Sequence, residues 1–207
     1  YYPHGALASH VLGYVGKIPS QQLDNYLNNK EKSYKSDDIV GLTGIESTQE
    51  DNLKGIDGYK KVKVNATGKV TDELEVKEPV SGDTVYLTID SDLQKVAEES
   101  LKKTLELIQT GGTYESEWGN VRLRKNNKIY NKAASGAVVA LDVKSGEVLA
   151  MASYPDYDPN IFTTGVSASD MDNLMPENLN DPLSPKPPYN NATMHSVTKL
   201  YKKNLLS

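Results

Sequence analysis

The sequence predicts an α+β protein in two parts, and three patterns support this fold class. Glycines punctuate the apolar runs between residues 41 and 68, which is typical of short strands joined by turns. A long amphipathic pattern begins at Ser91, and two apolar runs flank a glycine turn at residues 144–146. We therefore expect a β-rich first part over residues 1–82 and a mixed second part over residues 83–207.

The first part opens with an apolar run over residues 5–16, whose glycines do not suit a regular helix or strand. We expect a short buried element there that ends in a turn. Residues 19–38 are polar, with Leu23 and Leu27 four positions apart. This spacing permits one helix inside a solvated surface excursion.

Two glycine-containing units follow at residues 41–46 and 53–58, and their close spacing predicts turns. Residues 61–64 alternate between lysine and valine, the period of two that marks a half-buried strand. The alternation breaks at residues 66–68, which end in glycine. We therefore predict an antiparallel hairpin at this point.

The second part begins with residues 83–89, which are β-branched and aromatic enough to predict a strand. Ser91 followed by Gln94 forms a capping box, which predicts the start of a helix. Two glycines at positions 111 and 112 predict its end. Six apolar residues fall on one face of this helix, namely Leu93, Val96, Ala97, Leu101, Leu105 and Ile108.

The rest of the second part alternates between polar and apolar stretches. Residues 113–135 are polar and predict a long loop or a weak hairpin. Residues 136–142 and 147–153 are two apolar runs, and they predict a β-hairpin that is buried on both faces. Prolines recur from residue 155 to residue 188, which predicts irregular chain.

The composition excludes several classes of function. The 207 residues carry 23 basic and 28 acidic side chains and a formal net charge of -5. This balance does not predict electrostatic binding to nucleic acid or to an anionic membrane. The absence of cysteine excludes disulfides, thiolate metal sites and a cysteine nucleophile. No run of ~20 apolar residues occurs, so the sequence as given predicts no membrane span.

The histidines do not predict a metal centre. His4, His10 and His195 are far apart in the sequence and lack the spacing of metal ligands. His10 lies inside an apolar run, so we expect a structural histidine whose ring nitrogen finds a hydrogen-bond partner. The sequence thus predicts neither a metal site nor a cofactor.

Six stretches resemble segments of the class B penicillin-binding proteins and occur in that family's order. Each motif is short, but the ordered set is specific, and it covers residues 1–193. The stretches are residues 2–14 (similar to “YP…ASHVLGY”), 41–46 (“GxxGIE”), 53–58 (“LxGxxG”), 87–94 (“LTIDxxLQ”), 136–160 (“GAxVxLDxxTGEVLAMASYPxxDPN”) and 190–193 (“NRAT”).

The resemblance implies a fold and a parent protein. Residues 1–82 would be the end of the pedestal, or dimerisation, domain, and residues 83–207 an incomplete α/β sandwich of the transpeptidase domain. The parent would be a peptidoglycan D,D-transpeptidase, held at the extracytoplasmic face of the bacterial cytoplasmic membrane by an N-terminal anchor missing here. Its partners would be peptidoglycan stem peptides, β-lactams and cell-division or elongation proteins. The abrupt start at Tyr1 is read as that of an excised segment.

The chemistry of the family needs an S-x-x-K nucleophile, then S-x-N and K-T-G. Counting from the “NRAT” match places the serine at Tyr201 and the lysine at Asn204, and neither side chain can serve. S-x-x-K does occur at residues 196–199, five positions early, and again at residues 100–103. S-x-N and K-T-G do not occur. We therefore assign no catalytic residue, no cofactor-binding residue and no metal ligand.

Two alternatives stay open beside a catalytically inactive fragment. In the first, the chain is an active serine acyl-transferase in which Ser196 is the nucleophile and Lys199 its base. In the second, the chain is an unrelated cell-surface binding module. We expect the family pattern to end after residue 193, because the tail that follows His195 has no counterpart in the family.

Other chemically suggestive residues have structural interpretations. Residues 144–146 imitate K-T-G, but a glycine triplet between two apolar strands predicts a hairpin turn. Asp156 and Asp158 could suggest a calcium loop, yet the glycine and closing glutamate are missing, so we expect a turn initiated by Asp-Pro. Glu46 stands next to a glycine turn, and we interpret it as structural.

Overall fold

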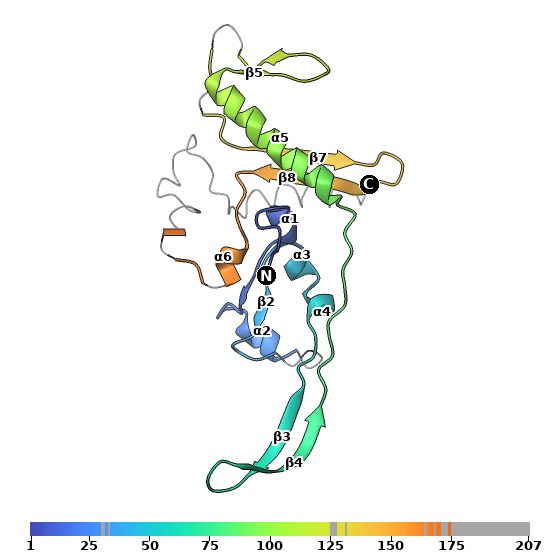
Figure 1. Cartoon of the computed structure of the whole chain (residues 1–207), viewed down its shortest axis with the longest axis vertical. Coiled ribbons are helices and arrows are strands. Elements are labelled where there is room, and N and C mark those ends of the chain that lie inside the picture. The colour runs from blue at the N-terminus through green and yellow to red at the C-terminus, as the bar shows by residue number, and fades with distance from the viewer. Residues whose placement is uncertain are drawn as a thin grey trace. The chain divides into compact units, whose positions relative to one another are not determined.

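The chain is described by a computed structural model, which divides into two compact units by its internal contacts. One unit is Gly13–Leu87, and the other combines Tyr1–Leu12 with the chain from Thr88 onward (Figure 1). The structure describes residues 1–29, 32, 34–124, 128–130, 132–163, 165–167, 169–170 and 174.

The Gly13–Leu87 unit contains a small antiparallel pair and three short helices. Strand β1 pairs with β2 from Val15↔Gly41 to Lys17↔Ile39. The predicted helix around Leu23 and Leu27 is confirmed. Two further short helices occur near the predicted turns: one begins inside residues 41–46, and the other ends where residues 53–58 begin. The elements are β1 (Val15–Lys17), α2 (Leu23–Leu27), β2 (Ile39–Gly41), α3 (Gly44–Thr48) and α4 (Glu50–Leu53).

The core of this unit draws a side chain from the stretch that we expected to be solvated. Tyr34 is buried beside Ile18 and Val40, and its ring meets that of Tyr26 edge-on at 4.9 Å between centroids. The Tyr34 hydroxyl donates a hydrogen bond of 3.1 Å to Oε1 of Glu50. The polar composition of the stretch predicted a surface position. Tyr34 nevertheless anchors it, because its ring is buried and its hydroxyl bonds to Glu50.

The predicted antiparallel hairpin is present as β3 (Tyr59–Val64) and β4 (Val70–Lys77). Asn65 organises its tip, because its Oδ1 accepts hydrogen bonds from the backbone N–H groups of Thr67 and Lys69 at 3.0 and 2.9 Å. The expectation of a half-buried strand was wrong, since every residue of both strands is exposed. Among the described residues, nothing covers the valine-bearing face of this hairpin.

The other unit is built around one long helix that lies across a hairpin (Figure 1). The hairpin runs antiparallel from Gly136↔Tyr154 to Leu141↔Val148. The elements are α1 (Ser9–Leu12), α5 (Ser91–Thr110), β5 (Thr113–Tyr114), β6 (Val121–Arg122), β7 (Gly136–Leu141), β8 (Val148–Tyr154) and α6 (Asn160–Thr163). The short β5–β6 pair is the weak hairpin that the polar stretch predicted.

The strand predicted at residues 83–89 is not formed. Only its end approaches β8, where the Thr88 hydroxyl donates to the Val148 carbonyl at 2.7 Å and the Asp90 N–H donates to the Leu149 carbonyl at 2.9 Å. Tyr86 is 91% exposed. The segment has strand-like composition, but no neighbouring strand in the described residues forms a ladder with it.

The start of α5 also differs from the prediction. The N-cap is Asp90, whose Oδ1 accepts hydrogen bonds from the N–H groups of Asp92 and Leu93 at 3.0 and 2.8 Å. Ser91 is therefore the first helical residue, and Gln94 does not reach back to close a capping box. An aspartate one position earlier satisfies the same free N–H groups, so the sequence contained two suitable caps.

The buried face of α5 is rotated relative to the prediction. Leu105 and Gln94 are buried, whereas Val96 is 57% exposed. Gly111, with a φ of 68°, ends the helix in the left-handed conformation, as predicted. The periodicity located the helix correctly, but a buried glutamine shifted the face that packs.

The β7–β8 hairpin has one covered face, which corrects the expectation that both faces are buried. Val148, Ala150 and Ala152 alternate as buried positions along β8. On β7, by contrast, Val139 and Leu141 are 49% and 55% exposed. In the described residues α5 packs on the hairpin, and no second layer covers the opposite face. The chain predicted as irregular beyond residue 155 forms α6, and residues 175–188 lie outside the described residues.

Candidate functional site

Gln94 on α5 makes a two-point contact with the backbone of β8. Its Oε1 accepts a hydrogen bond from the Met151 N–H at 2.7 Å, and its Nε2 donates to the Met151 carbonyl at 2.9 Å. The side chain is only 1% exposed, so these partners replace water completely. The primary amide thus satisfies the strand edge in the way that a neighbouring strand would.

Glu98, one helical turn further on, connects this contact to the start of the chain. Its Oε1 accepts hydrogen bonds from Gln94 Nε2 at 2.7 Å and from the backbone N–H of Ala8 at 2.8 Å. Ala8 has a φ of 55°, the left-handed region that residues with a Cβ seldom adopt. We call residues 1–12 the N-terminal segment, and Glu98 is one of the groups that hold it.

Asn160 holds the other end of the N-terminal segment. Its Oδ1 accepts from the Tyr2 N–H, and its Nδ2 donates to the Tyr2 carbonyl, both at 2.8 Å. Asp158 orients this amide, because its Oδ1 accepts from the Asn160 N–H and from Nδ2, both at 2.9 Å. The turn that Asp158-Pro159 was predicted to initiate is therefore present and leads into α6.

His10 and Tyr157 complete the attachment of the segment. The His10 Nε2 lies 2.9 Å from the Pro155 carbonyl, and the Tyr157 hydroxyl donates to the Ser9 carbonyl at 3.1 Å. The rings of His10 and Tyr157 meet edge-on at 5.2 Å between centroids. His10 is thus the structural histidine that the sequence predicted.

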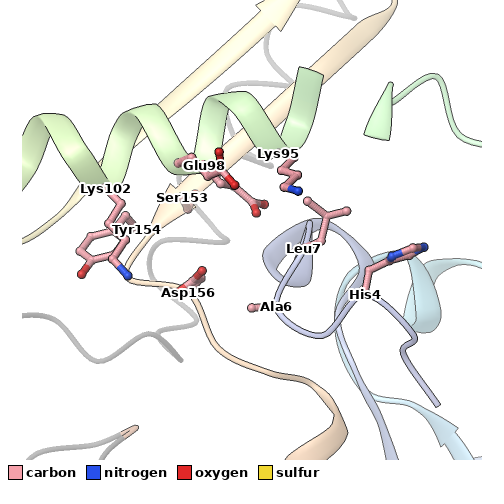
Figure 2. Close-up of a pocket in the computed structure, with 10 residues that line it drawn as sticks. His4, Ala6, Leu7, Lys95, Glu98, Lys102, Ser153, Tyr154 and Asp156 are labelled. Carbon is pink, nitrogen blue, oxygen red and sulfur yellow. The ribbon is translucent and has the colours of Figure 1, made fainter. Parts of the chain in front are cut away.

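A pocket of about 380 Å³ lies where the N-terminal segment, α5 and the end of β8 meet (Figure 2). Lys95 and Lys102 line it from α5, and Asp156 lies on the opposite side with the N-terminal segment. Ser153 and Tyr154 contribute the end of β8. The lining carries charges of both signs, which excludes a simple site for anions or for metal cations.

The S-x-x-K match on α5 is not an activated pair. Lys103 places its Nζ 5.3 Å from the centre of the Tyr114 ring, a cation–π contact. No hydrogen bond joins the Ser100 hydroxyl to this lysine within the described residues. Activation of a serine requires a base within hydrogen-bonding distance, so this match is accidental.

The K-T-G imitation at residues 144–146 is a hairpin turn, as predicted. Oδ1 of Asp142 accepts from the N–H groups of Lys144 and Ser145 at 2.7 and 3.1 Å. These two hydrogen bonds lower the pKa of the Asp142 carboxyl. Gly146 has a φ of 78°, which a residue with a Cβ would adopt only with strain.

The remaining residues that the sequence singled out separate into two groups. His4 lines the pocket, and Glu46 lies in the first turn of α3. The candidate nucleophile and its base, Ser196 and Lys199, lie outside the described residues. The same is true of His195, Tyr201, Asn204 and the “NRAT” match.

The polar network itself was missed by the sequence reasoning. Gln94 and Glu98 stand one helical turn apart on the packed face of α5, where a purely apolar stripe was expected. That spacing on a buried face is the signal that could have found them. Their partners on the N-terminal segment and on β8 are backbone atoms, which leave no trace in the sequence.

Neither a metal-binding cluster nor a membrane-spanning helix is present in the described residues. Within the described ranges, no three His, Cys, Asp or Glu side chains come together in a way that could hold a metal ion. No helix in the described part of the chain has both the length and the apolar character to cross a bilayer.

Comparison with protein families gives two matches in succession. The model “Penicillin-binding Protein dimerisation domain” matches residues 1–87. The model “Penicillin binding protein transpeptidase domain” matches residues 136–199. Both models describe penicillin-binding proteins, and their order is the one that the motifs predicted.

Curated relatives share this region. The peptidoglycan D,D-transpeptidase MrdA of Escherichia coli (strain K12) is 35% identical over 187 residues, which are 89% of this chain and 24% of that protein. The protein of the same name from Acinetobacter baumannii is 32% identical over 183 residues, 88% of this chain and 22% of that protein. The chain thus spans less than a quarter of the length of these two relatives.

Solved structures agree with the relatives. A structure described as “Structural coordination of polymerization and crosslinking by a peptidoglycan synthase complex” matches with a TM-score of 0.66 and 34% identity, over 89% of this chain and 29% of that one. The complex of PBP2 with MreC from Helicobacter pylori matches with a TM-score of 0.60 and 32% identity, over 89% of this chain and 28% of that one. This chain belongs to the class B penicillin-binding proteins.

Proposed function

We propose that this chain is a non-catalytic section of its family, which connects the dimerisation domain to the first layer of the transpeptidase domain. The observation that carries the proposal is the contrast between the two ordered family matches and the missing chemistry. S-x-N and K-T-G do not occur in the sequence, and the S-x-x-K at residues 100–103 has its lysine against Tyr114. The Gln94–Glu98 network joins α5 to β8 and to the N-terminal segment, which is a structural role.

The domain boundary proposed for this section lies between residues 82 and 83. Residues 1–82 would be the end of the dimerisation domain, and residues 83–207 the beginning of the transpeptidase domain. The N-terminal segment would bridge the two domains, because it precedes Gly13 in the chain and yet binds α5 and the turn before α6. The hydrogen bonds of Glu98 and Asn160 support this assignment of the segment.

The activity proposed for the whole protein is that of a peptidoglycan D,D-transpeptidase. It would cross-link stem peptides through an acyl-enzyme and would react with β-lactams, at the extracytoplasmic face of the bacterial cytoplasmic membrane. The name that the relatives carry supports the reaction. Division or elongation proteins would be its partners, and the relative solved with MreC favours an elongation partner.

Labelling of the full chain with a fluorescent penicillin tests the absence of catalysis. We expect no covalent label after incubation and denaturing electrophoresis, because no base is held against a serine in the described residues. The chain denatured before labelling supplies the background signal.

The alternative, an active acyl-transferase, predicts the opposite result. The match to the transpeptidase model extends to Lys199 and so includes Ser196, which is why this alternative is retained. Label located at Ser196 by mass spectrometry, and abolished by Ser196→Ala but not by Ser100→Ala, would overturn the proposal of inactivity.

A further inference from the structure

Strand β8 has one edge that is not paired with another strand. It pairs with β7, and within the described residues the sheet has only these two strands. Leu149 and Met151 direct backbone groups to the free edge, where the Asp90 N–H and the Gln94 amide satisfy them. Because backbone direction alternates along a strand, Ser153 is the next residue to face this edge.

At Ser153, no side chain or loop takes the place of a neighbouring strand at the free edge in the described residues. In the described part of the chain, no group outside β7 forms a hydrogen bond with its N–H or its C=O. Ser153 also lines the pocket of about 380 Å³, so this part of the strand borders the pocket. The volume lies within the range of small-molecule sites, about 300–1,000 Å³, and suits two or three residues of extended peptide.

The charges around the pocket are unusual because they are not paired with each other. Lys95 and Lys102 are seven residues apart on α5, which separates them by about 10 Å along the helix axis. Glu99 and Asp156 are the acidic groups that line the pocket beside Glu98. In the described residues these four form no salt bridge, whereas Glu98 is already occupied by Gln94 and Ala8.

We propose that this pocket binds a short extended peptide with charged ends, which adds to the free edge of β8 at Ser153. A main-chain carbonyl of the peptide would accept from the Ser153 N–H, and a main-chain N–H would donate to its carbonyl. The carboxylate end would meet Lys95 or Lys102, and the ammonium end would meet Glu99 or Asp156. This inference goes beyond the proposed function and does not depend on it.

Other ligand classes fit the lining less well. Three carboxylates, Glu98, Glu99 and Asp156, would repel a polyphosphate or a nucleic acid. A simple ion would use one charge only and would leave the strand edge unpaired. A peptide with two charged ends satisfies both the charges and the backbone groups.

A titration of the ¹⁵N-labelled full chain with unblocked trialanine tests the proposal. We expect a saturable shift of the Ser153 amide signal, and at least about a tenfold weaker affinity for trialanine that is acetylated and amidated at its ends. The double variants Lys95→Ala/Lys102→Ala and Glu99→Ala/Asp156→Ala should each weaken binding in the same way, because each removes both candidate partners of one charged end. Lys144→Ala, a lysine in the exposed β7–β8 turn, is the matched control and should bind like the unaltered chain.

Three results would overturn the proposal. The first is no saturable shift up to about 10 mM peptide, a concentration that already corresponds to very weak binding. The second is equal affinity for blocked and unblocked trialanine, a comparison that uses the unaltered protein and so does not depend on whether a variant folds. The third is an equal shift with free alanine, which would indicate a charge site without strand addition.

Discussion

Gln94 and Glu98 show how two side chains can hold three pieces of backbone together. The glutamine satisfies both backbone groups of Met151, and the glutamate accepts from Gln94 and from Ala8. Buried polar groups are costly unless they are paired, so each member of this network depends on the others. The attachment of the N-terminal segment to α5 therefore depends on these individual side chains.

Replacement of Gln94 by leucine should be strongly destabilising. The substitution leaves the N–H and C=O of Met151 without partners in a buried position, and we expect a loss of about 2–4 kcal/mol in the free energy of unfolding. Urea denaturation followed by circular dichroism measures it. Gln109→Leu is the matched control, because Gln109 makes a single hydrogen bond, to the Ala133 carbonyl, and should cost less than about 1 kcal/mol.

Tyr34 predicts how stability depends on alkaline pH. Burial and the hydrogen bond to Glu50 raise the pKa of the Tyr34 hydroxyl above its ordinary value of 10.0. Because the folded-state pKa is raised, its stabilising contribution is fully present below pH 10 and is lost as pH rises through the folded pKa. Unfolding measured between pH 8 and about pH 11.5 should show this decline.

The matched variants separate Tyr34 from the other tyrosines. Tyr34→Phe should reduce the alkaline decline, since one titrating hydroxyl with a raised pKa is gone. Part of the decline should remain, because the pKa values of Tyr26 and Tyr59 are also raised. Tyr86→Phe should leave it unchanged, because Tyr86 is 91% exposed. An identical alkaline profile for Tyr34→Phe and the unaltered chain would contradict the assignment to Tyr34.

Among the elements, α5 organises its unit. It runs for 20 residues from a capped start at Asp90 to a left-handed glycine at Gly111, and it packs on β8 more extensively than on β7. The β3–β4 hairpin is the opposite case, because it is exposed along its whole length and is held by cross-strand pairs such as Lys61–Glu75 at 2.6 Å. Exposed ion pairs contribute little, so this hairpin should be the less stable element.

The cap of α5 can be tested directly. Asp90→Ala removes the acceptor for two N–H groups of the first turn and should cost about 1 kcal/mol of stability. Asp92→Ala removes an equal charge from the same turn without removing a cap, and its loss should be smaller, about 0.3–0.5 kcal/mol. Equal losses for the two variants, measured by urea denaturation, would show that charge rather than capping matters.

At the scale of the whole molecule, the chain exposes much apolar surface. Val139 and Leu141 on β7 and the valines of the β3–β4 hairpin are uncovered in the described residues. With small cores in both units, we expect marginal stability and a thermal midpoint below about 65 °C, the upper part of the usual mesophile range. Calorimetry would contradict this with a cooperative transition well above that temperature.

The N-terminal segment should contribute to the unit that contains α5. Deletion of residues 1–8 removes the contacts of Asn160 and Glu98 with Tyr2 and Ala8. We expect the thermal midpoint to fall by several degrees, at about 2–4 °C for each kcal/mol lost. Tyr1→Ala is the control, because Tyr1 is exposed. An unchanged midpoint after the deletion would show that the segment does not stabilise the unit.

The sequence by itself determined the family, the place of α5, the two hairpins and the turn interpretation of residues 144–146. Each of these follows from periodicity, from glycine chemistry or from ordered motifs, all of which are local in the chain. Only the tertiary structure decided that Asp90 rather than Ser91 caps α5, and that Gln94 and Glu98 join Met151 to Ala8. The cap depends on which of two adjacent residues takes the non-helical backbone conformation, since either side chain could serve. The Gln94–Glu98 contacts reach backbone atoms distant in sequence, whose hydrogen bonds any residue type can make, so the residue pattern does not specify these partners.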